Sequence, residues 1–289
     1  MKKVYFNGFW GGFIEKTDPI NVDFFTTFLF DIYGEKIMIT FNLDEADILV
    51  EASFTNTYYV NYKNWDASFL FTGESWHRVC KSAYSLYTCI LGPEHTADNF
   101  VAFPFYILYM KLYPHYMAFE PTKCIKNNNV SAVLGYHHDS ARCFFLEALE
   151  KRMNVLYGGG YKNNIGGRLE GHFASDSLHN FYKNSKFVIT MENTKKEHYI
   201  TEKLINGFRA GIIPIYWGSP HISEYFNTKR FLILEDDSET SINAVIDRMV
   251  NMSDEEYFQI VNEPIFNEGI NADIVYNNIV NNIKKLVLK

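Results

Sequence analysis

The chain has 289 residues, which is long for one compact domain and suits two domains of roughly 100 to 150 residues each. Hydrophobic residues make up 47% of the chain and aromatic residues 17%, enough for a core in each domain, which excludes a disordered chain. The formal net charge of −7, with no long block of Lys or Arg, argues against general nucleic-acid binding.

The cysteines and the apolar runs indicate the cellular compartment of the protein. The four cysteines are sparse and lack Cys-X-X-Cys spacing, so we expect reduced thiols and no zinc site. They are Cys80, Cys89, Cys124 and Cys143. The apolar run at the N-terminus is short and interrupted by glycines, unlike a signal peptide, and no apolar stretch reaches the roughly 18 to 20 residues that span a bilayer. We therefore expect a cytoplasmic protein, with a peripheral membrane contact left open.

The first part of the chain, up to about residue 115, alternates short apolar runs with amphipathic stretches. The apolar runs are rich in β-branched and aromatic residues and have the length of buried strands in a parallel sheet. They span residues 3–6, 36–42, 46–52, 68–73 and 87–92. A helix is predicted over 23–33. This pattern predicts a first α/β domain.

A polar connector over residues 121–130 interrupts the alternation, because Pro121 and the asparagines at 127–129 break the apolar pattern. We place the domain boundary there. The prediction is an N-terminal domain over 1–122 and a C-terminal domain over 123–289.

The second part of the chain again alternates strands with helices, as in a doubly wound domain. The predicted strands span residues 130–134, 154–157, 186–192, 212–217 and 230–234, and the predicted helices span 140–153 and 202–210. Beyond Asp236 the chain is predicted to be helical to its end. Four apolar residues at helical spacing mark a packing stripe in this last part: Val275, Ile279, Ile283 and Leu286.

The polar loop and helix that follow the third of these strands are the most informative segment. Glu192 and Asn193 come at the carboxyl end of the strand, where open α/β sheets bind their ligands. Thr201 is a plausible N-cap, and Lys203 follows in the first helical turn, where free N–H groups and the helix dipole suit a phosphate. Glu202 beside it better suits sugar hydroxyls or the positive charge that grows on an anomeric carbon.

Several residue types recur here at fixed offsets, and the set resembles the signature of the α1,3-fucosyltransferases, glycosyltransferase family ten. The matching runs are Glu192-Asn193, Tyr199-Ile200-Thr201-Glu202-Lys203, Ala210-Gly211 and Ile213-Pro214-Ile215-Tyr216-Trp217-Gly218-Ser219-Pro220. Two further segments are similar to family motifs in the expected order. Phe71-Thr72-Gly73-Glu74-Ser75 is similar to the strand-end motif of the general base, and Ser140-Ala141-Arg142 to the helix whose arginine reaches the donor pyrophosphate.

The resemblance implies a GT-B type fold, with two facing Rossmann-like domains and a cleft between them. It implies that the N-terminal domain binds the acceptor and the C-terminal domain the GDP-sugar donor. The implied reaction is an inverting transfer of L-fucose from GDP-fucose to a hydroxyl of an N-acetylglucosamine or glucose unit in a glycan, with α1,3 linkage. GDP-fucose and an oligosaccharide acceptor are the partners expected, in protein glycosylation or glycan biosynthesis.

The resemblance also implies roles for individual residues. Glu74 is expected to be the general base, because a strand-end carboxylate can take the proton of the attacking hydroxyl, and Glu94 is its rival. Glu202 is the second catalytic candidate, as a contact to the donor sugar or to the ribose. The donor-binding candidates are Arg142, Asn193, Tyr199 and Lys203. Because protein cations can neutralise the leaving diphosphate, and no convincing Asp-X-Asp motif follows a strand, no metal or cofactor is expected to be required.

Two alternatives stay open. One is a GT-B transferase that uses another nucleotide sugar, which would keep the phosphate contacts and change the sugar contacts. The other is a catalytically inactive GDP-sugar binding protein. The glycines at 158–160 lack the GxGxxG spacing of a phosphate loop and are interpreted as a tight loop near the donor.

Overall fold

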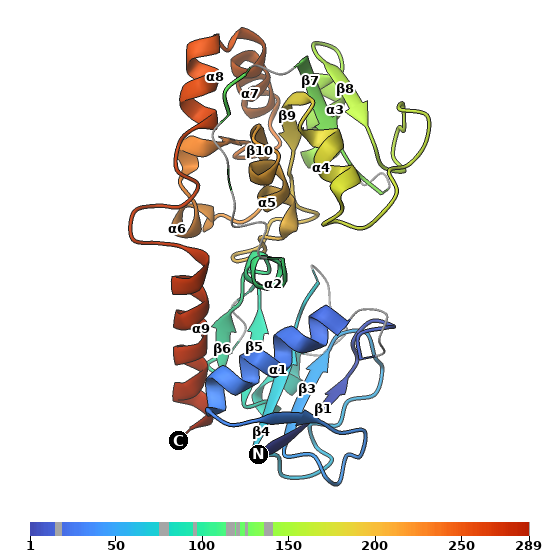
Figure 1. Cartoon of the computed structure of the whole chain (residues 1–289), viewed down its shortest axis with the longest axis vertical. Coiled ribbons are helices and arrows are strands. Elements are labelled where there is room, and N and C mark those ends of the chain that lie inside the picture. The colour runs from blue at the N-terminus through green and yellow to red at the C-terminus, as the bar shows by residue number, and fades with distance from the viewer. Residues whose placement is uncertain are drawn as a thin grey trace. The chain divides into compact units, whose positions relative to one another are not determined.

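The computed structural model describes residues 1–14, 19–74, 81–94, 97–113, 119, 122–124, 127–135 and 141–288 (Figure 1). The chain divides into two compact units. The first unit comprises Met1–Leu112, Lys196–Tyr199 and Asn271–Lys289, and the second comprises Tyr113–Lys195 and Ile200–Ile270. Each unit has its own parallel sheet with helices, so the prediction of two Rossmann-like α/β domains is confirmed.

The sheet of the first unit has six strands, all parallel, in the order β2-β1-β3-β4-β5-β6. The strands are β1 (Lys2–Asn7), β2 (Ile37–Ile39), β3 (Ile48–Ala52), β4 (Ala67–Phe71), β5 (Cys89–Gly92) and β6 (Phe100–Ala102). Every residue of β3, β4 and β5 is buried, as expected for strands covered on both faces. Each predicted apolar run overlaps one of the strands β1 to β5, whereas the three-residue β6 is too short to stand out in the sequence.

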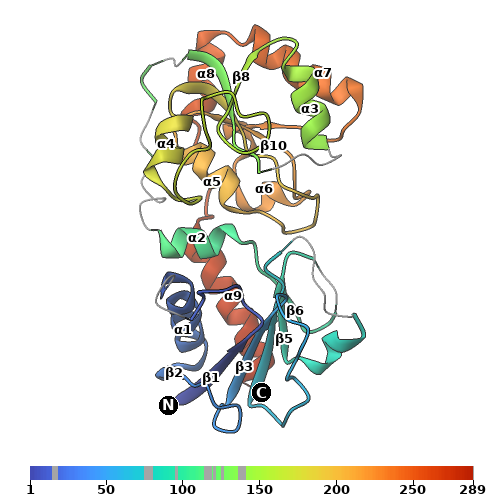
Figure 2. The same ribbon diagram turned by 90° about the vertical axis from the view of Figure 1, so that its right-hand side faces the viewer.

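Helices and a short 3-10 helix cover the two faces of this sheet. The elements are α1 (Pro19–Tyr33), α2 (Tyr106–Leu112), α9 (Ala272–Val287) and the 3-10 helix η1 (Lys81–Leu86). Helices α1 and α9 lie side by side (Figure 2), and the ring of Tyr276 on α9 lies 6.4 Å from that of Phe24 and 5.8 Å from that of Phe28 on α1. Tyr84 of η1 packs in a separate apolar cluster with Leu70 and Ile90.

The last helix differs from the sequence-based domain prediction, because α9 belongs to the first unit and does not end the second. Its buried residues are Ala272, Tyr276, Ile279, Val280 and Ile283. Lys111 of α2 also pairs with Asp273 at its start, with 2.6 Å between Nζ and Oδ1. An apolar stripe shows that a helix packs but not against which domain, so the return of the chain to the first unit is not visible in the sequence.

The sheet of the second unit has five parallel strands in the order β11-β10-β9-β7-β8. They are β7 (Asn127–Ala132), β8 (Asn154–Tyr157), β9 (Ser185–Ile189), β10 (Ile213–Tyr216) and β11 (Leu232–Ile233). The asparagines at 127–129, predicted to lie in the connector, instead begin β7. Asn129 is paired there with a second asparagine, because Asn154 Nδ2 at the start of β8 donates to Asn129 Oδ1 over 2.9 Å.

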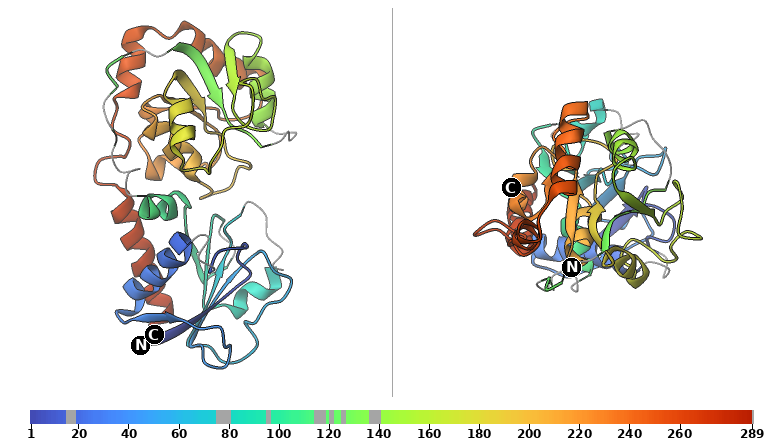
Figure 3. Two further views of the ribbon diagram at one scale, coloured as in Figure 1. Left: turned by 45° about the vertical axis from the view of Figure 1, so that its right-hand side comes forward. Right: turned by 90° about the horizontal axis from the view of Figure 1, so that it is seen from above.

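Helices lie on both faces of the second sheet, so the prediction of a doubly wound domain is confirmed (Figure 3). One core contains side chains of α3 (Ala141–Leu149), α7 (Glu239–Asn251) and α8 (Asp254–Val261). A separate core contains side chains of α4 (Asp176–Tyr182) and of the segment after α5 (Glu202–Arg209). The short helices α6 (Ile222–Tyr225) and η3 (Thr228–Arg230) complete the unit. No helix in the described part of the chain is long and apolar enough to cross a membrane.

Candidate functional site

The second sheet has a switch point at β7, because the chain leaves β7 toward β8 on one side and returns to β9 on the other. At such a point the connections after the two central strands diverge, which opens a ligand crevice at their carboxyl ends. Helix α3 is the next element after β7, and α5 the next after β9. Both helices therefore begin at this edge, and their N-terminal N–H groups favour an anion there.

Arg142 and Asn193 meet at this edge from the two sides of the switch point. Arg142 lies in the first turn of α3 and is only 7% exposed, and Asn193 lies in the loop after β9. Arg142 Nη1 donates a hydrogen bond to Asn193 Oδ1 over 3.0 Å. The amide thereby orients a guanidinium, whose planar set of N–H donors suits a phosphate. Two of the predicted donor-binding residues are thus brought together.

Glu192 organises the start of α5. This carboxylate is fully buried, and Oε1 accepts the backbone N–H of Thr201 over 2.7 Å. The Thr201 hydroxyl lies 2.9 Å from Oε2, and Lys203 Nζ lies 3.2 Å from the same oxygen. Thr201 is also the N-cap of α5, as predicted, since its hydroxyl accepts the N–H of Lys203. One buried side chain therefore fixes both the cap and the first cation of this helix.

Lys203 is placed between two carboxylates yet reaches the surface. Its Nζ lies 3.2 Å from Glu192 and 3.8 Å from Glu202, and its side chain is 26% exposed. Burial raises the pKa of Glu192, while the ammonium of Lys203 and the donors of Thr201 act in the opposite direction. A partly exposed cation at a helix N-terminus is available to a diphosphate, and Glu202 precedes it in the same turn.

Two glycines let the backbone approach closely at this edge. A Cβ at Gly218 would lie 2.6 Å from Tyr216 Oη and 2.8 Å from Glu192 Cγ, so a side chain would displace the buried carboxylate. A Cβ at Gly159 would lie 2.0 Å from the carbonyl oxygen of Leu134, just beyond β7. The glycine loop after β8 is therefore tight and packs at the carboxyl end of β7.

The candidate bases lie in the first unit, at the ends of adjacent strands. Glu74 follows β4 and is partly exposed, and Glu94 follows β5. Glu94 forms an ion pair with Lys196, with 2.9 Å between Oε2 and Nζ. Gly73 holds the Glu74 segment close to β4, because a Cβ there would lie 2.5 Å from the ring of Phe71. The last residue of this motif, Ser75, lies outside the described residues, as does Ser140 before Arg142.

Tyr199 is grouped differently from the other donor-binding candidates. It belongs to the first unit, where its ring packs edge-on against Phe105 with 5.7 Å between centroids. Its backbone N–H donates to the carbonyl of Lys196. Arg142, Asn193 and Lys203 gather in the second unit.

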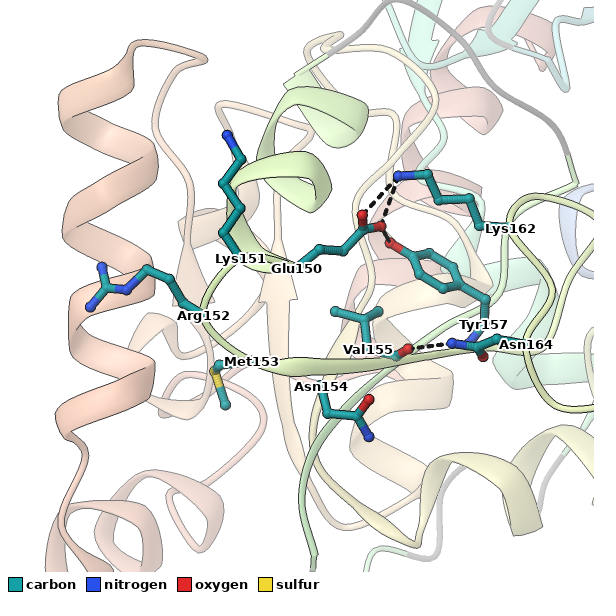
Figure 4. Close-up of a pocket in the computed structure, with 9 residues that line it drawn as sticks. All are labelled: Glu150, Lys151, Arg152, Met153, Asn154, Val155, Tyr157, Lys162 and Asn164. Carbon is teal, nitrogen blue, oxygen red and sulfur yellow. Dashed lines mark hydrogen bonds and ion pairs between the residues drawn. The ribbon is translucent and has the colours of Figure 1, made fainter.

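A hollow elsewhere in the second unit is lined mainly by polar and charged residues, and its carboxylate, Glu150, is already paired (Figure 4). It has a volume of about 540 Å³ and lies at the C-terminal end of α3, opposite the end that carries Arg142. Lys162 Nζ donates to both oxygens of Glu150, over 2.9 and 2.8 Å, and the hydroxyl of Tyr157 donates to the same carboxylate. Among the described residues no group of three His, Cys, Asp or Glu side chains is arranged to hold a metal ion.

Glu192 is the functional residue that the sequence alone does not assign. The sequence predicts its position at the strand end. It assigns no role to the side chain, because the sequence does not show that this carboxylate is buried. The usable signal is an acidic residue directly after an apolar strand, a place where an isolated charge costs free energy unless it is paired.

Comparisons with known proteins match part of the chain to one family. Residues 123–260 match the family model "Glycosyltransferase family 10 (fucosyltransferase) C-term". The putative fucosyltransferase R654 of Acanthamoeba polyphaga mimivirus is 38% identical over 122 residues, which cover 40% of this chain and 20% of the relative. The alpha-(1,3)-fucosyltransferase FucT of Helicobacter pylori is 32% identical over 112 residues, which cover 39% of this chain and 22% of the relative. The chain thus spans about a fifth of the length of these curated relatives.

A crystal structure of an α1,3-fucosyltransferase superposes with a TM-score of 0.75 at 19% identity, covering 100% of this chain and 90% of the other. The same fold in complex with GDP-fucose superposes with a TM-score of 0.70 at 18% identity, with the same coverage. At this level of identity the likeness shows a shared fold.

Proposed function

We propose that the chain, whose residues 123–260 match the model of glycosyltransferase family 10, is a member of that family and transfers L-fucose from GDP-fucose to a carbohydrate acceptor. The observation that carries the proposal is the pair of cations at the switch point of the second sheet. Arg142 is oriented by Asn193, and Lys203 is held by Glu192 at the start of α5. The names of the relatives and of the GDP-fucose complex support this choice of donor.

The two cations suit the leaving group. As the bond from fucose to the diphosphate breaks, negative charge grows on the phosphate oxygens, and donors already in place stabilise it without reorganising. Arg142 and Lys203 supply full charges, and the N–H groups that begin α3 and α5 add partial ones. With these groups present the proposed reaction does not depend on a divalent metal.

In the proposed mechanism Glu74 takes the proton from the attacking acceptor hydroxyl, and the configuration at the anomeric carbon is inverted. Glu74 is preferred to Glu94 because Phe71-Thr72-Gly73-Glu74-Ser75 resembles the strand-end motif of the general base. Glu202 contacts the fucose, where a carboxylate stabilises the positive charge that develops at the anomeric centre. The acceptor is a hydroxyl of an N-acetylglucosamine or glucose unit, and the linkage is α1,3.

The test is the structure of the product made from GDP-fucose and N-acetyllactosamine, determined by NMR, with a parallel reaction in EDTA. The β-linked fucose of the donor should become α-linked at O3 of N-acetylglucosamine, at the same rate in both samples. Transfer from a different nucleotide sugar, with none from GDP-fucose, would show that the donor is wrong. Retained anomeric configuration would contradict the role of Glu74, and loss of activity in EDTA would contradict metal independence.

A further inference from the structure

The first sheet also has a switch point, at the carboxyl ends of β1 and β3. Its strand order reverses at β1, which lies between β2 and β3. The loops that follow β1 and β3 leave the sheet next to each other, because Asn7 and Glu51 are paired at the ends of these strands. This edge is where a parallel sheet binds ligands.

A buried carboxylate ties the two loops together. Glu51 is fully buried, and its Oε1 accepts from Asn7 Nδ2 over 2.6 Å and from the backbone N–H of Tyr59 over 2.7 Å. Its Oε2 accepts from the hydroxyl of Tyr87 over 2.7 Å. A buried charge is costly unless it is fully hydrogen-bonded, and three donors from three segments meet that need here. The loops are therefore held in one arrangement.

Gly8 joins the loops a second time through the backbone. It has φ of +72°, and a Cβ at this position would lie 2.4 Å from the carbonyl oxygen of Ala52. Its own carbonyl accepts the N–H of Phe54 over 2.7 Å. A left-handed backbone in close contact with the next strand end is the situation that requires glycine.

The two joined loops carry the partly exposed aromatic side chains of Trp10 and Phe54. The Phe9 and Phe13 rings are stacked 3.9 Å apart, and Trp10 packs edge-on against Phe13. Trp10 also meets Phe54 edge-on, with 6.1 Å between centroids and an angle of 84°. Phe54 is 39% exposed, and Trp10 is partly exposed. Two rings thus keep a fixed mutual orientation while apolar surface stays in contact with solvent.

We propose that Trp10 and Phe54 form a stacking platform that binds a pyranose ring of the carbohydrate acceptor. An aromatic face is partly negative and attracts the partly positive C–H groups on the apolar face of an uncharged sugar. The proposal rests on the proposed function, which requires a sugar acceptor near the base. The first unit supplies that proximity, because β4, which leads to Glu74, is the neighbour of β3 at about 5 Å.

The shared aromatic core supports the same placement. The ring of Phe9, beside Trp10, lies 6.2 Å from that of Phe71, and the two rings are parallel within 11°. Phe71 ends β4 and is followed after two residues by Glu74. The platform and the candidate base are therefore built on one packed aromatic layer.

The test replaces each ring and measures the two substrates separately. We expect Trp10→Ala and Phe54→Ala each to raise the KM for N-acetyllactosamine about tenfold, with the KM for GDP-fucose unchanged. Phe54→Tyr keeps an aromatic face and should restore the acceptor KM. Phe30→Ala is the matched control, because Phe30 is 49% exposed in the same unit but lies in the last turn of α1.

An acceptor KM that is unchanged in both variants, or changed equally in Phe30→Ala, would overturn the platform. So would an equal rise in the KM of both substrates together with a lower Tm, which indicates a damaged fold. Saturation-transfer NMR of N-acetyllactosamine on the protein without donor gives a readout that does not need turnover. If the natural chain transfers no fucose, the proposed function fails. In that case the NMR signal of the sugar decides about the platform. A signal that is present with the natural chain and lost with Trp10→Ala supports it, and any other result overturns it.

Discussion

The carboxyl edges of the two sheets use the same device in different chemical settings. Each has a fully buried glutamate that ties neighbouring segments together, Glu51 in the first unit and Glu192 in the second. The donors around Glu51 are uncharged, an amide, a backbone N–H and a phenol, whereas Glu192 faces the ammonium of Lys203. A buried anchor beside aromatic rings suits a neutral ligand, and one that holds a cation suits an anion.

The largest effect is expected for the base. Glu74→Gln should lower kcat by about a thousandfold, because the attacking hydroxyl loses its proton acceptor. GDP binding, measured by calorimetry, should be unchanged. The comparator is Glu94→Gln, the neighbouring carboxylate engaged by Lys196, for which we expect a loss under tenfold. If the two variants exchange these results, Glu94 is the base.

The cations of the second unit come next. Arg142→Ala and Lys203→Ala should each lower kcat/KM for GDP-fucose by about a hundredfold, because each removes a charge that stabilises the leaving diphosphate. Arg152→Ala is the matched control in this unit, since Arg152 lies near the opposite end of α3 (Figure 4). Its guanidinium pairs with Asp247. Equal losses in Arg142→Ala and Arg152→Ala would show a general effect of charge and contradict a specific site.

Glu192→Gln sharpens the comparison through its coupling to Lys203. We expect a loss of about tenfold in kcat/KM for GDP-fucose, because Lys203 loses the carboxylate that positions it. In the Lys203→Ala background the same change should cost little more, since it acts through an ammonium that is no longer there. Losses that multiply across the two changes would assign Glu192 a structural role only. Glu150→Gln, which frees Lys162 from its carboxylate, is the control.

Glu51→Gln should act on the other substrate. The amide keeps the shape but removes the charge that three donors share, so we expect about 1 to 3 kcal/mol less free energy of unfolding. The acceptor KM should rise severalfold with GDP binding unchanged. Denaturant unfolding and steady-state kinetics measure the two effects. A weaker affinity for GDP in this variant would contradict the assignment of the two substrates to the carboxyl edges of two different sheets.

The smallest effect concerns pH. Burial raises the folded-state pKa of Glu192, so the folded protein binds a proton more readily than the unfolded chain. This proton stabilises the fold fully at a pH below the pKa of Glu192 in the unfolded chain, which is about 4.3. The stabilisation is lost as the pH rises through the folded-state pKa. The natural chain should therefore lose free energy of unfolding relative to Glu192→Gln as pH rises over this window. A difference that is independent of pH would contradict the shift.

Much of this organisation could be predicted from the sequence, because parallel sheets and helix caps depend on local patterns. Apolar runs marked most strands, and Thr201 was identifiable as a cap from its place before Glu202 and Lys203. The pairing of Arg142 with Asn193 could not be derived, since it joins elements 51 positions apart across the switch point.

Other features depend on long-range packing that leaves no local trace. Helix α9 returns to the first unit although its stripe has the same period that it would have in the second. The asparagines at 127–129 lie in a strand because β8 and β9 pair with it on both sides. The burial of Glu51 and Glu192 likewise follows from neighbours distant in the chain, so their anchoring roles emerge only from the structure.

The most direct test of two separate substrate sites is a paired measurement of both KM values in Lys203→Ala and Trp10→Ala. We expect a crossed result, in which Lys203→Ala raises only the KM for GDP-fucose and Trp10→Ala raises only the KM for the acceptor. Both variants raising the same KM, or each raising both, would contradict the assignment of the two substrates to two separate sheet edges.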